Sequence, residues 1–334
     1  MRKIVCFGEA LIDMLGLPTG HPDAPTAFHQ NAGGAPANVA VGIARLGGAA
    51  CFVGMLGRDL FGDFLLERMA AAGVDLGHVQ RTDAARTALA FVSLDAQGER
   101  SFSFYRPPSA DLLFESAHFQ PACFESLGTF HACSNSLTGE GVAQATLDGM
   151  RRARAAGALV SFDMNLRPAL WPADVTPGER IAQALALADL VKLSREELTY
   201  LAAFLQTTDE AAIAQLLAGH TRLLVITDGG APLRWYTRTG RGERAGFEVT
   251  VRDTTAAGDA FVAGLLFALA RRGVDAAGLD ALAEDAEALD EPLRFAAATG
   301  ALAVTRAGAF AAMPSLAQVQ ALLETERRDD AIVA

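Results

Sequence analysis

The sequence predicts an α/β protein in which a three-layer α/β/α domain with a mostly parallel sheet carries a small β-sheet lid. Short runs of β-branched and apolar residues alternate with amphipathic helical patterns along most of the chain, which is typical of βα units around a parallel sheet. Two neighbouring segments instead alternate apolar and polar residues on either side of a turn, which predicts an antiparallel hairpin. The 334 residues, 51% of them hydrophobic, are enough for one large core, so we expect a single domain over 1–334.

The expected elements follow the chain in order. Buried strands are predicted in apolar runs bounded by Gly or Asp, at 4–7, 51–54, 130–133, 159–162, 190–193 and 223–226. Helices are predicted between them, at 36–46, 59–72, 141–156, 178–188, 195–204 and 210–218. The hairpin joins 87–94 to 100–105 through a turn at 95–98. Together with 11–29 it is expected to form a lid over one end of the main domain, with segments at about 11–29 and 87–108.

Charge and cysteine usage limit the class of partner and the compartment. The net charge of -11 and the pI near 5.0 exclude nucleic acid as an expected partner, because phosphate backbones are bound by clustered Lys and Arg. The four cysteines lie far apart without C-x-x-C spacing, and the N-terminus lacks a long apolar stretch. We therefore expect a reduced, cytoplasmic protein. No apolar run approaches the length of about 20 residues that a membrane helix needs, so no membrane is expected as a partner.

A run of small residues at 253–261, Asp-Thr-Thr-Ala-Ala-Gly-Asp-Ala-Phe, opens a helix that is expected to begin near Ala257. Free N–H groups at such a helix start form an anion site, and the helix dipole favours negative charge there. A bound phosphate would repel Asp259, but this carboxylate would be useful as a base for a neutral hydroxyl that attacks the phosphate. The alternative is that 253–255 are helix caps and that Asp259 only balances the dipole.

This run resembles the signature Asp-Thr-x-Gly/Ala-Ala-Gly-Asp of the ribokinase-like (PfkB) carbohydrate kinases, and the resemblance covers nearly the whole chain. It implies a ribokinase-like fold and transfer of a phosphoryl group from ATP, with Mg²⁺, to a small-molecule sugar. By this resemblance Asp259 is the catalytic base. The N–H groups of Ala256, Ala257 and Gly258 would stabilise the charge on the transferred group. Ala256 stands where many members of the family carry Gly.

A second segment, at 31–40, leads a pair of glycines into a helix whose first turn carries Asn38. Gly33 and Gly34 let the backbone approach a ligand closely, and Asn38 offers both donors and an acceptor to sugar hydroxyls. An ordinary glycine turn with proline at the helix start is the alternative. In the family this segment binds sugar together with an early acidic residue, which implies that Asp13 accepts hydrogen bonds from the substrate; without the family, Asp13 reads equally as a solvated strand-end residue.

The segment Asp-Met-Asn-Leu-Arg at 163–167 follows a predicted strand, where open α/β sheets place their ligands. An internal pair between Asp163 and Arg167 in a loop is the alternative that the spacing leaves open. The segment resembles the family pattern Asp-x-Asn-x-Arg. That resemblance implies that Asn165 and Arg167 line the cleft for phosphate and sugar, with Arg167 supplying positive potential.

The next strand runs into a helix through Lys192, Ser194 and Glu197, and the last two have the spacing of a capping box. The family places an Asn-x-x-Glu motif here, which helps to hold Mg²⁺ and phosphates through water. The resemblance therefore implies that Glu197 contacts Mg²⁺ through water, with Ser194 in the usual place of Asn. It also implies that Lys192 faces the nucleotide phosphates, whereas a solvated lysine at a strand end is the alternative.

The segment 227–232 resembles the nucleotide loop Thr-Leu-Gly-x-x-Gly of the family, which implies that Thr227 and Gly229 contact the nucleotide. Asp228 and Pro232 depart from that pattern. Near the C-terminus, the helix that contains Ala297 resembles the one that backs adenine. The resemblance also implies a monovalent-cation site for K⁺, although Ala312 replaces a serine ligand of ribokinase. Its residues would be Asp253, Thr255, Ala303, Arg306 and Gly308.

The sugar is indicated by the hairpin segment 102–111, which resembles the pattern Phe-Tyr-Arg-x-Pro-Ser-Ala-Asp of the bacterial fructokinases. Tyr105 and Arg106 would present a hydroxyl and a donor fork to fructose. Read alone, the arginine could equally blunt an exposed edge strand. A 2-keto-3-deoxygluconate kinase is the nearest alternative, although Phe104 stands where that enzyme has tyrosine, and ribokinase is another.

Two different classes of protein stay open as alternatives. One is a noncatalytic regulator that binds sugar or nucleotide on the same fold, although such a protein would be expected to lack the base Asp259. The other is a dinucleotide-dependent oxidoreductase, against which the missing Gly-x-Gly-x-x-Gly fingerprint counts. Lid strands often pair between subunits of ribokinase-like enzymes, so the resemblance implies that a homodimer through the lid is possible.

Overall fold

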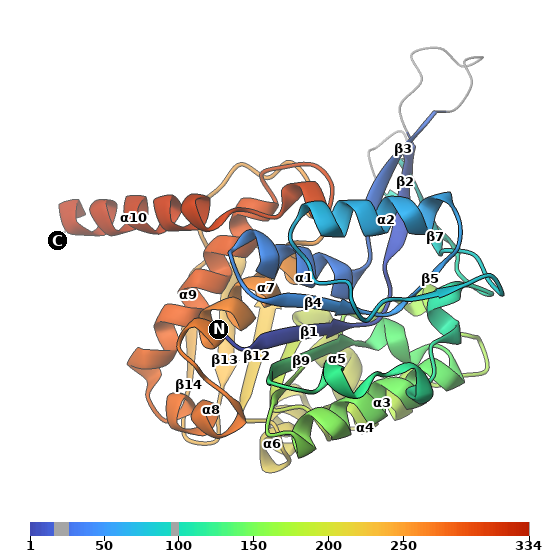
Figure 1. Cartoon of the computed structure of the whole chain (residues 1–334). Coiled ribbons are helices and arrows are strands. Elements are labelled where there is room, and N and C mark those ends of the chain that lie inside the picture. The colour runs from blue at the N-terminus through green and yellow to red at the C-terminus, as the bar shows by residue number, and fades with distance from the viewer. Residues whose placement is uncertain (17–26, 95–99, 334) are drawn as a thin grey trace.

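The computed structural model describes residues 1–16, 27–94 and 100–333. Its centre is an eight-stranded sheet in the order β14-β13-β12-β11-β10-β9-β1-β4 (Figure 1). The strands from β12 to β4 are parallel, whereas β13 and β14 continue the sheet in antiparallel pairing. Their bounds are β1 Lys3–Phe7, β4 Ala50–Val53, β9 Leu127–Cys133, β10 Leu159–Asp163, β11 Leu190–Ser194, β12 Leu223–Asp228, β13 Ala231–Tyr236 and β14 Arg241–Arg244. The predicted α/β class and its mostly parallel sheet are confirmed.

Helices cover both faces of this sheet, and alternate strand residues point into the two layers, as the period of a strand requires. Ile4 and Cys6 of β1 belong to the core cluster on one face, and Val5 and Phe7 to the cluster on the other. The first face packs against α1 Ala35–Arg45, α2 Leu60–Ala71, α7 Ala257–Arg271, α8 Ala276–Ala283 and α9 Ala286–Ala303. The second packs against α3 Glu140–Ala155, α4 Pro177–Leu185, α5 Arg195–Phe204 and α6 Asp209–Ala218.

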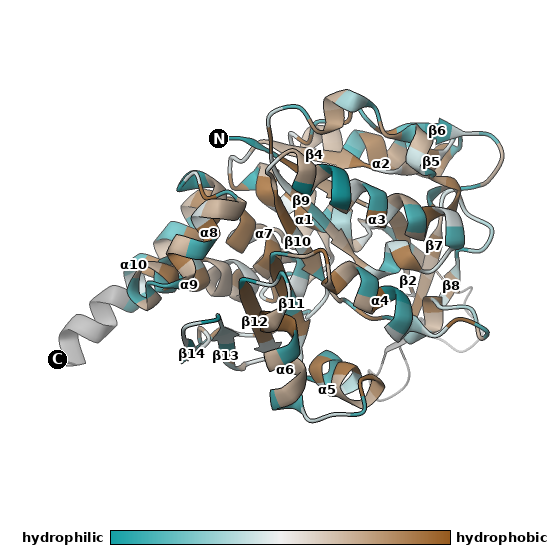
Figure 2. Cartoon of the chain, turned by 90° about the horizontal axis from the view of Figure 1, so that it is seen from below, coloured by the Kyte–Doolittle hydropathy of each residue, from teal (hydrophilic) through white to brown (hydrophobic). Residues whose placement is uncertain are grey.

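The helix predictions for α1 to α6 are confirmed with ends shifted by a few residues, and α7 begins at Ala257 as expected. The last helix, α10 Leu316–Val333, packs against α9. Figure 2 shows hydrophobic strands β10, β11 and β12 surrounded by helices that carry hydrophilic residues. No helix in the described part of the chain has the length and the apolar composition needed to cross a bilayer.

The lid is a separate four-stranded sheet in the order β3-β2-β7-β8. Its strands are β2 Leu11–Gly16, β3 Phe28–Gly33, β7 Leu89–Leu94 and β8 Arg100–Tyr105. The predicted antiparallel hairpin is confirmed as β7 and β8, while β2 and β7 pair in parallel. Beyond the predicted lid segment at about 11–29, β3 continues to Gly33, the first glycine of the segment 31–40. Residues 17–26 and the predicted turn at 95–98 lie outside the described residues.

Two pairs of strands, β13 with β14 and β5 with β6, have no counterpart among the predicted elements. Residues 227–232 were expected to form a loop, but Pro232 lies within β13. Proline is tolerated there because the pairing of β12 with β13 is irregular between Ile226 and Asp228, and sheet prolines concentrate at such places. A small sheet pairs β5 Met55–Gly57 with β6 Gln80–Thr82 in parallel.

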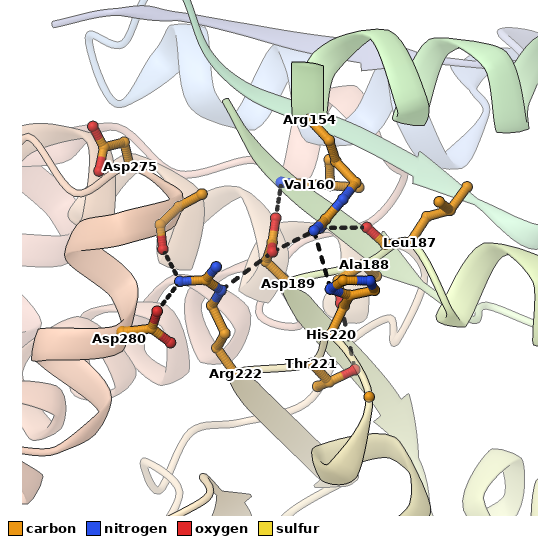
Figure 3. Close-up of polar contacts among 12 residues, drawn as sticks. Arg154, Val160, Leu187, Ala188, Asp189, His220, Thr221, Arg222, Asp275 and Asp280 are labelled. Atoms are coloured by element: carbon orange, nitrogen blue, oxygen red, sulfur yellow. Dashed lines mark hydrogen bonds and ion pairs between the residues drawn. The ribbon is translucent and has the colours of Figure 1, made fainter. Parts of the chain in front are cut away.

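A buried ion network holds the layers together at the amino ends of the central strands (Figure 3). The Asp189 carboxylate, whose side chain is 1% exposed, accepts from Arg154 Nη1 at 2.9 Å and lies 3.3 Å from Arg222 Nε. Its second oxygen accepts from Val160 N at 3.0 Å. Arg222 also pairs with Asp280 on α8. One carboxylate therefore ties α3, β10 and, through Arg222, α8 to a single point.

The carboxyl ends of β1, β9, β10, β11 and β12 meet at the opposite edge of the sheet. The segments with candidate functional residues begin just after these ends at Gly8, Ser134 and Met164, and at the last strand residues Ser194 and Asp228. The N-terminus of α7 and the lid complete this edge, which is where ligands bind in open α/β sheets.

Candidate active site

The start of α7 is shaped by a tight turn at 253–256. Ala256 has φ 58°, in the left-handed region, and is the residue before the helix. The Asp253 carboxylate fixes the turn, because it accepts from Thr255 N at 2.8 Å and from Gly308 N at 2.9 Å. Among the described residues no side chain caps α7. Ala257 N donates to Thr254 O at 3.3 Å within the turn, whereas the Gly258 N–H in the first turn of the helix remains available for an anion.

Asp259 lies one residue further along α7 and is buried against the segment 31–40. Asn38 Nδ2 donates to Asp259 Oδ2 at 2.7 Å. Burial raises the pKa of Asp259 to about 7, the Asn38 hydrogen bond opposes that rise, and the Asp163 carboxylate adds to it. A carboxylate that titrates near neutral pH is suited to accept a proton from a hydroxyl. The structure thus places the predicted base and the predicted sugar ligand Asn38 in direct contact.

Asp163 and Lys192 form a buried ion pair beside the α7 turn. Lys192 Nζ donates to the two Asp163 oxygens at 3.1 and 3.2 Å. Burial lowers the pKa of Lys192, but Asp163 and Glu197 outweigh it and leave the pKa raised. A Cβ atom on Gly258 would lie 3.2 Å from Lys192 Nζ, so the cation adjoins the helix start. The alternative of a solvated Lys192 is therefore wrong.

The loop after β10 is held by Asp163, which forms no ion pair with Arg167 within the described part of the chain. Asn165 adopts φ 37°, and its N–H donates to Asp163 Oδ1 at 3.2 Å. Arg167 is exposed and donates to Leu166 O at 3.1 Å. Its positive charge lowers the pKa of Asp259. Asp163 takes Lys192 as its partner, so the alternative of an internal pair between Asp163 and Arg167 is wrong for this structure.

The predicted capping box of α5 is present. Glu197 N donates to Ser194 Oγ at 3.2 Å, and Ser194 N donates to Glu197 Oε2 at 2.7 Å. The other oxygen, Glu197 Oε1, accepts from Leu166 N at 2.8 Å. Burial raises the pKa of Glu197, Lys192 opposes that rise, and Asp163 adds to it. Glu197 therefore braces the loop at 164–167 against the end of β11.

The glycines at the end of β3 are required by close approach. A Cβ atom on Gly33 would lie 2.3 Å from Asp13 Oδ2, and one on Gly34 would lie 2.6 Å from Glu9 O. Gly34 also has φ 101°. Asp13 lies on β2 opposite Asn31 of β3, and it is only partly exposed. The strand pairing thus brings Asp13, Gly33 and Gly34 to one place, as the sequence predicts.

Tyr105 and Arg106 were expected to act together, but the structure separates them. Successive residues of an extended chain point to opposite sides. Tyr105 is 67% exposed and packs its ring 5.2 Å from that of Phe91. Arg106 is 2% exposed and lies 2.6 Å from Asp111 Oδ2. The predicted pair is therefore not a joint donor set, and the alternative of an exposed edge arginine is wrong.

All three nitrogens of the Arg106 guanidinium donate hydrogen bonds to other groups of the protein. Its Nε donates to Asp111 Oδ2 at 2.8 Å, its Nη1 to Thr138 Oγ1 at 3.0 Å, and its Nη2 to Asn135 O at 2.8 Å. Burial lowers the pKa of Arg106, but Asp111 and Glu9 outweigh it and leave the pKa raised. The arginine is thus a permanently charged group that two carboxylates already compensate.

Glu9 and Asn135 lie next to the segment 31–40 and were not predicted as site residues. Glu9 Oε1 accepts from Asn135 Nδ2 at 2.9 Å and from Ala35 N at 3.3 Å, and burial raises the pKa of Glu9. Within the described part of the chain, several buried polar atoms here have no partner: Glu9 Oε2, Asn38 Oδ1, Ser134 Oγ and Asn135 Oδ1. Such a group of unsatisfied atoms indicates that a polar ligand or water completes the site.

A cleft of about 640 Å³ opens on the other side of the α7 turn. It is lined by the predicted nucleotide residues Thr227, Gly229, Gly258 and Ala297. Asp228 and Pro232 also line it, so both departures from the family pattern face this space. Lys192, Ser194 and Glu197 are not among the lining residues. The segment 245–251, which contributes Ala245, Gly246, Phe247, Glu248, Val249 and Val251, was missed because it has no periodic pattern. Volume and apolar walls suit a flat aromatic base.

The residues of the expected monovalent-cation site lie in two adjoining segments. Arg252 N and Asp253 N both donate to Val304 O, at 2.8 and 3.1 Å. The bond from Gly308 N to Asp253 joins the segments again. Ala303 O accepts from Arg306 N at 3.3 Å. The arrangement offers one buried carboxylate among backbone oxygens, which is the kind of oxygen set that hard cations prefer.

Comparison with known proteins gives one consistent result. Residues 1–316 match the model of the pfkB family carbohydrate kinases. The chain is 42% identical over 327 residues to the probable fructokinase-7 of Arabidopsis thaliana, covering 97% of this chain and 93% of that protein. It resembles the crystal structure of a fructokinase with bound ATP from Xylella fastidiosa with a TM-score of 0.94 and 57% identity, over 97% and 99% of the two chains. A Vibrio cholerae O395 fructokinase in a fructose, ADP and calcium ion bound form gives a TM-score of 0.81 and 32% identity, over 97% and 99%.

Proposed function

The chain belongs to the pfkB family of carbohydrate kinases, and from this premise we propose that it transfers the terminal phosphoryl group of ATP to fructose, giving fructose 6-phosphate. The observation that carries the proposal is the contact between Asp259 and Asn38, which joins the base to the sugar motif at 2.7 Å. The same helix start that holds Asp259 lines the 640 Å³ cleft through Gly258. Sugar hydroxyl and nucleotide phosphate would thus meet at one helix terminus.

The geometry supports an in-line transfer in which the residues position, activate and neutralise. Asp259 takes the proton as the sugar O–H bond breaks, and the sugar oxygen forms a bond to the terminal phosphorus of ATP. The bond from that phosphorus to its bridging oxygen breaks and leaves ADP. The N–H group of Gly258, with Lys192 Nζ 3.2 Å from the Gly258 Cβ position, would face the developing negative charge.

Mg²⁺ would reach this site with the phosphates and would neutralise part of their charge. Clusters of three or more metal-binding side chains do not occur among the described residues, so a direct protein cage for Mg²⁺ is not part of the proposal. Glu197 remains the proposed contact through water. A carboxylate has about four lone-pair positions, so the two backbone N–H bonds to Glu197 leave room for such a water.

We expect Glu197→Gln to raise the Mg²⁺ concentration for half-maximal activity about 10-fold, the usual effect of losing an outer-shell partner. It should also lower the free energy of unfolding by about 1 kcal/mol, because one backbone N–H loses its acceptor. Titration of Mg²⁺ in a coupled ADP assay and urea unfolding would measure both. Glu196→Gln is the matched control, since Glu196 is exposed in the same helix turn. If stability falls while the Mg²⁺ curve stays in place, Glu197 acts only as a cap.

The state of Arg106 favours a neutral sugar over a keto acid. A carboxylate ligand would need a cation with unused charge and free donors. Arg106 instead lies 2.6 Å from Asp111 and donates to Asn135 and Thr138. The unsatisfied oxygens nearby, on Glu9 and Asn135, are acceptors for sugar hydroxyls and would repel a carboxylate. This argues for fructose against 2-keto-3-deoxygluconate, and the presence of Asp259 argues against a noncatalytic regulator.

A panel assay of ADP release with fructose, 2-keto-3-deoxygluconate, ribose and adenosine tests the proposed function. We expect kcat/KM for fructose to exceed each of the others at least about tenfold, which corresponds to roughly 1.4 kcal/mol of selective transition-state binding. ADP release without any sugar provides the background rate. A preference for the keto acid would overturn the choice of fructose, and no sugar-dependent release at all would overturn the kinase.

K⁺ would bind between 252–255 and 303–308 around Asp253. Comparing activity in KCl with activity in NaCl would measure its effect.

Two subunits would pair through the lid, where Phe28, Phe91 and Tyr105 form a row with ring distances of 5.2 Å. A single-subunit mass in sedimentation would contradict this pairing.

A cytoplasmic location is supported by the four free cysteines, which are all buried.

A further inference from the structure

A second cleft of about 560 Å³ lies on the α1 and α2 side of the protein and shares no lining residue with the nucleotide cleft. Its walls come from β3, α1, α2 and the short helix η6 Phe310–Ala312. The polar lining side chains are Gln30, Asn31, Arg45 and Arg68, while Val41, Phe64 and several alanines supply the apolar part. The proposed sugar kinase reaction does not use this space.

The cleft concentrates positive charge in a protein whose net charge is -11. No carboxylate lines it, and within the described part of the chain neither Arg45 nor Arg68 pairs with one. Burial and the positive charge of Arg306 lower the pKa of Arg45. Two arginines thus line this cleft without a carboxylate among its lining residues, and the charge of a third acts on Arg45. Such an arrangement is unfavourable when empty and is relieved when an anion binds.

Both lining arginines have contacts within the protein, although the Arg68 side chain is exposed. Arg45 Nη1 donates to Phe310 O at 3.0 Å and to Ala311 O at 3.4 Å, which fixes one end of its guanidinium at η6. The Arg68 guanidinium lies 4.9 Å from the centre of the Phe64 ring, one helix turn back on α2. Planar guanidinium groups bind phosphoryl oxygens through paired N–H bonds. Ordering such side chains in advance reduces the entropy lost when a ligand binds.

We propose that this cleft is a regulatory site that binds a phosphoryl group through Arg45 and Arg68. Its volume exceeds what bare phosphate fills, and Gln30 also lines it, so a small phosphorylated polyol fits its chemistry. Two of the segments that line the cleft continue into the candidate active site. β3 continues into Gly33, and η6 follows Gly308, whose N–H holds Asp253. A ligand that ties β3 to α2 and η6 therefore acts on both the sugar motif and the α7 turn.

Calorimetry on the whole protein tests the site after the active site has been filled with fructose and a nonhydrolysable ATP analogue. Inorganic phosphate and fructose 6-phosphate are the two probes, and they distinguish free phosphate from a phosphorylated metabolite as the source. We expect wild type to bind at least one of them at one further site. Arg68→Glu should weaken that binding about tenfold or more, because it reverses one of two paired charges.

Arg271→Glu is the matched control. Arg271 also lies over the ring four residues earlier, at 5.7 Å from Phe267, and the substitution changes the net charge equally. It should leave binding within about twofold. Arg68→Gln removes the charge without reversing it and should give an intermediate loss. Absence of binding in wild type, equal weakening by both glutamate variants, or binding that persists in Arg68→Glu would each overturn the proposal.

Steady-state kinetics measure separately whether a probe bound in this cleft affects the active site. The bound probe should change KM for fructose in wild type and in Arg271→Glu but not in Arg68→Glu, which should keep wild-type kcat and KM in the absence of probe. A KM that responds equally in all three proteins would assign the effect to product or phosphate in the active site. That result would overturn the regulatory role whether or not fructose is the preferred sugar.

Discussion

Asp259→Asn is expected to lower kcat by about 10²–10⁴-fold, because a positioned general base typically contributes that much to a rate. Asparagine keeps the size of the side chain and the contact with Asn38 but cannot take the proton. Binding of ATP and fructose, measured by calorimetry, should stay within a few-fold. A variant that keeps more than a tenth of wild-type kcat would show that Asp259 is not the base.

The pH dependence of kcat/KM and of stability provides a second test of Asp259. Since burial raises the pKa of Asp259 to about 7, kcat/KM should rise with pH through about 7 and level off above it, as the deprotonated form accumulates. The raised pKa also favours the folded state at low pH, and this contribution is lost as pH rises through about 7. Asp259→Asn removes that loss, so thermal unfolding at pH 8 should find the variant at least as stable as wild type.

Asp189→Ala is expected to lower the free energy of unfolding by about 3–5 kcal/mol, the usual cost of removing one partner of a buried ion network. Arg154 and Arg222 would lose their shared carboxylate, and Val160 N would lose its acceptor (Figure 3). Urea unfolding followed by circular dichroism measures the change. The physical reason is the burial of Asp189, whose side chain is 1% exposed.

Asp280→Ala is the matched control for this prediction. Asp280 pairs with the same Arg222, but its side chain is 49% exposed, so its removal should cost only about 0–1 kcal/mol. Equal losses in the two variants would show that burial does not set the strength of the network. Activity per folded molecule should be unchanged in both, because neither residue lies at the carboxyl edge of the sheet.

The helices and the parallel strands could be predicted because local signals and tertiary packing agree there. The capping residues Ser194 and Glu197 mark the start of α5, and small residues mark the start of α7. β13 escaped prediction because Gly229, Gly230 and Pro232 are local turn signals, whereas pairing with β12 is decided by the sheet. Propensity gives way to tertiary context at such places.

The geometry of the candidate site could be predicted where a motif fixes both residues and backbone, as for Asp259 and Gly34. Arg106 shows what sequence spacing does not contain. Its neighbours in space are Asp111, Thr138 and Asn135, and their approach depends on how the lid meets the main sheet. Glu9 was passed over for a similar reason, because its partners come from α1 and from the segment after β9.

The Asp189 network lies at one end of the central strands, and the groups proposed for chemistry lie at the other. The two sets share strands but no side chains: β10 contributes Val160 to the first and Asp163 to the second. Heat tolerance and turnover can therefore be altered independently in this molecule. Substitutions near Arg154 and Arg222 should therefore change the free energy of unfolding, those near Asp163 should change kcat, and the two effects should add with little coupling.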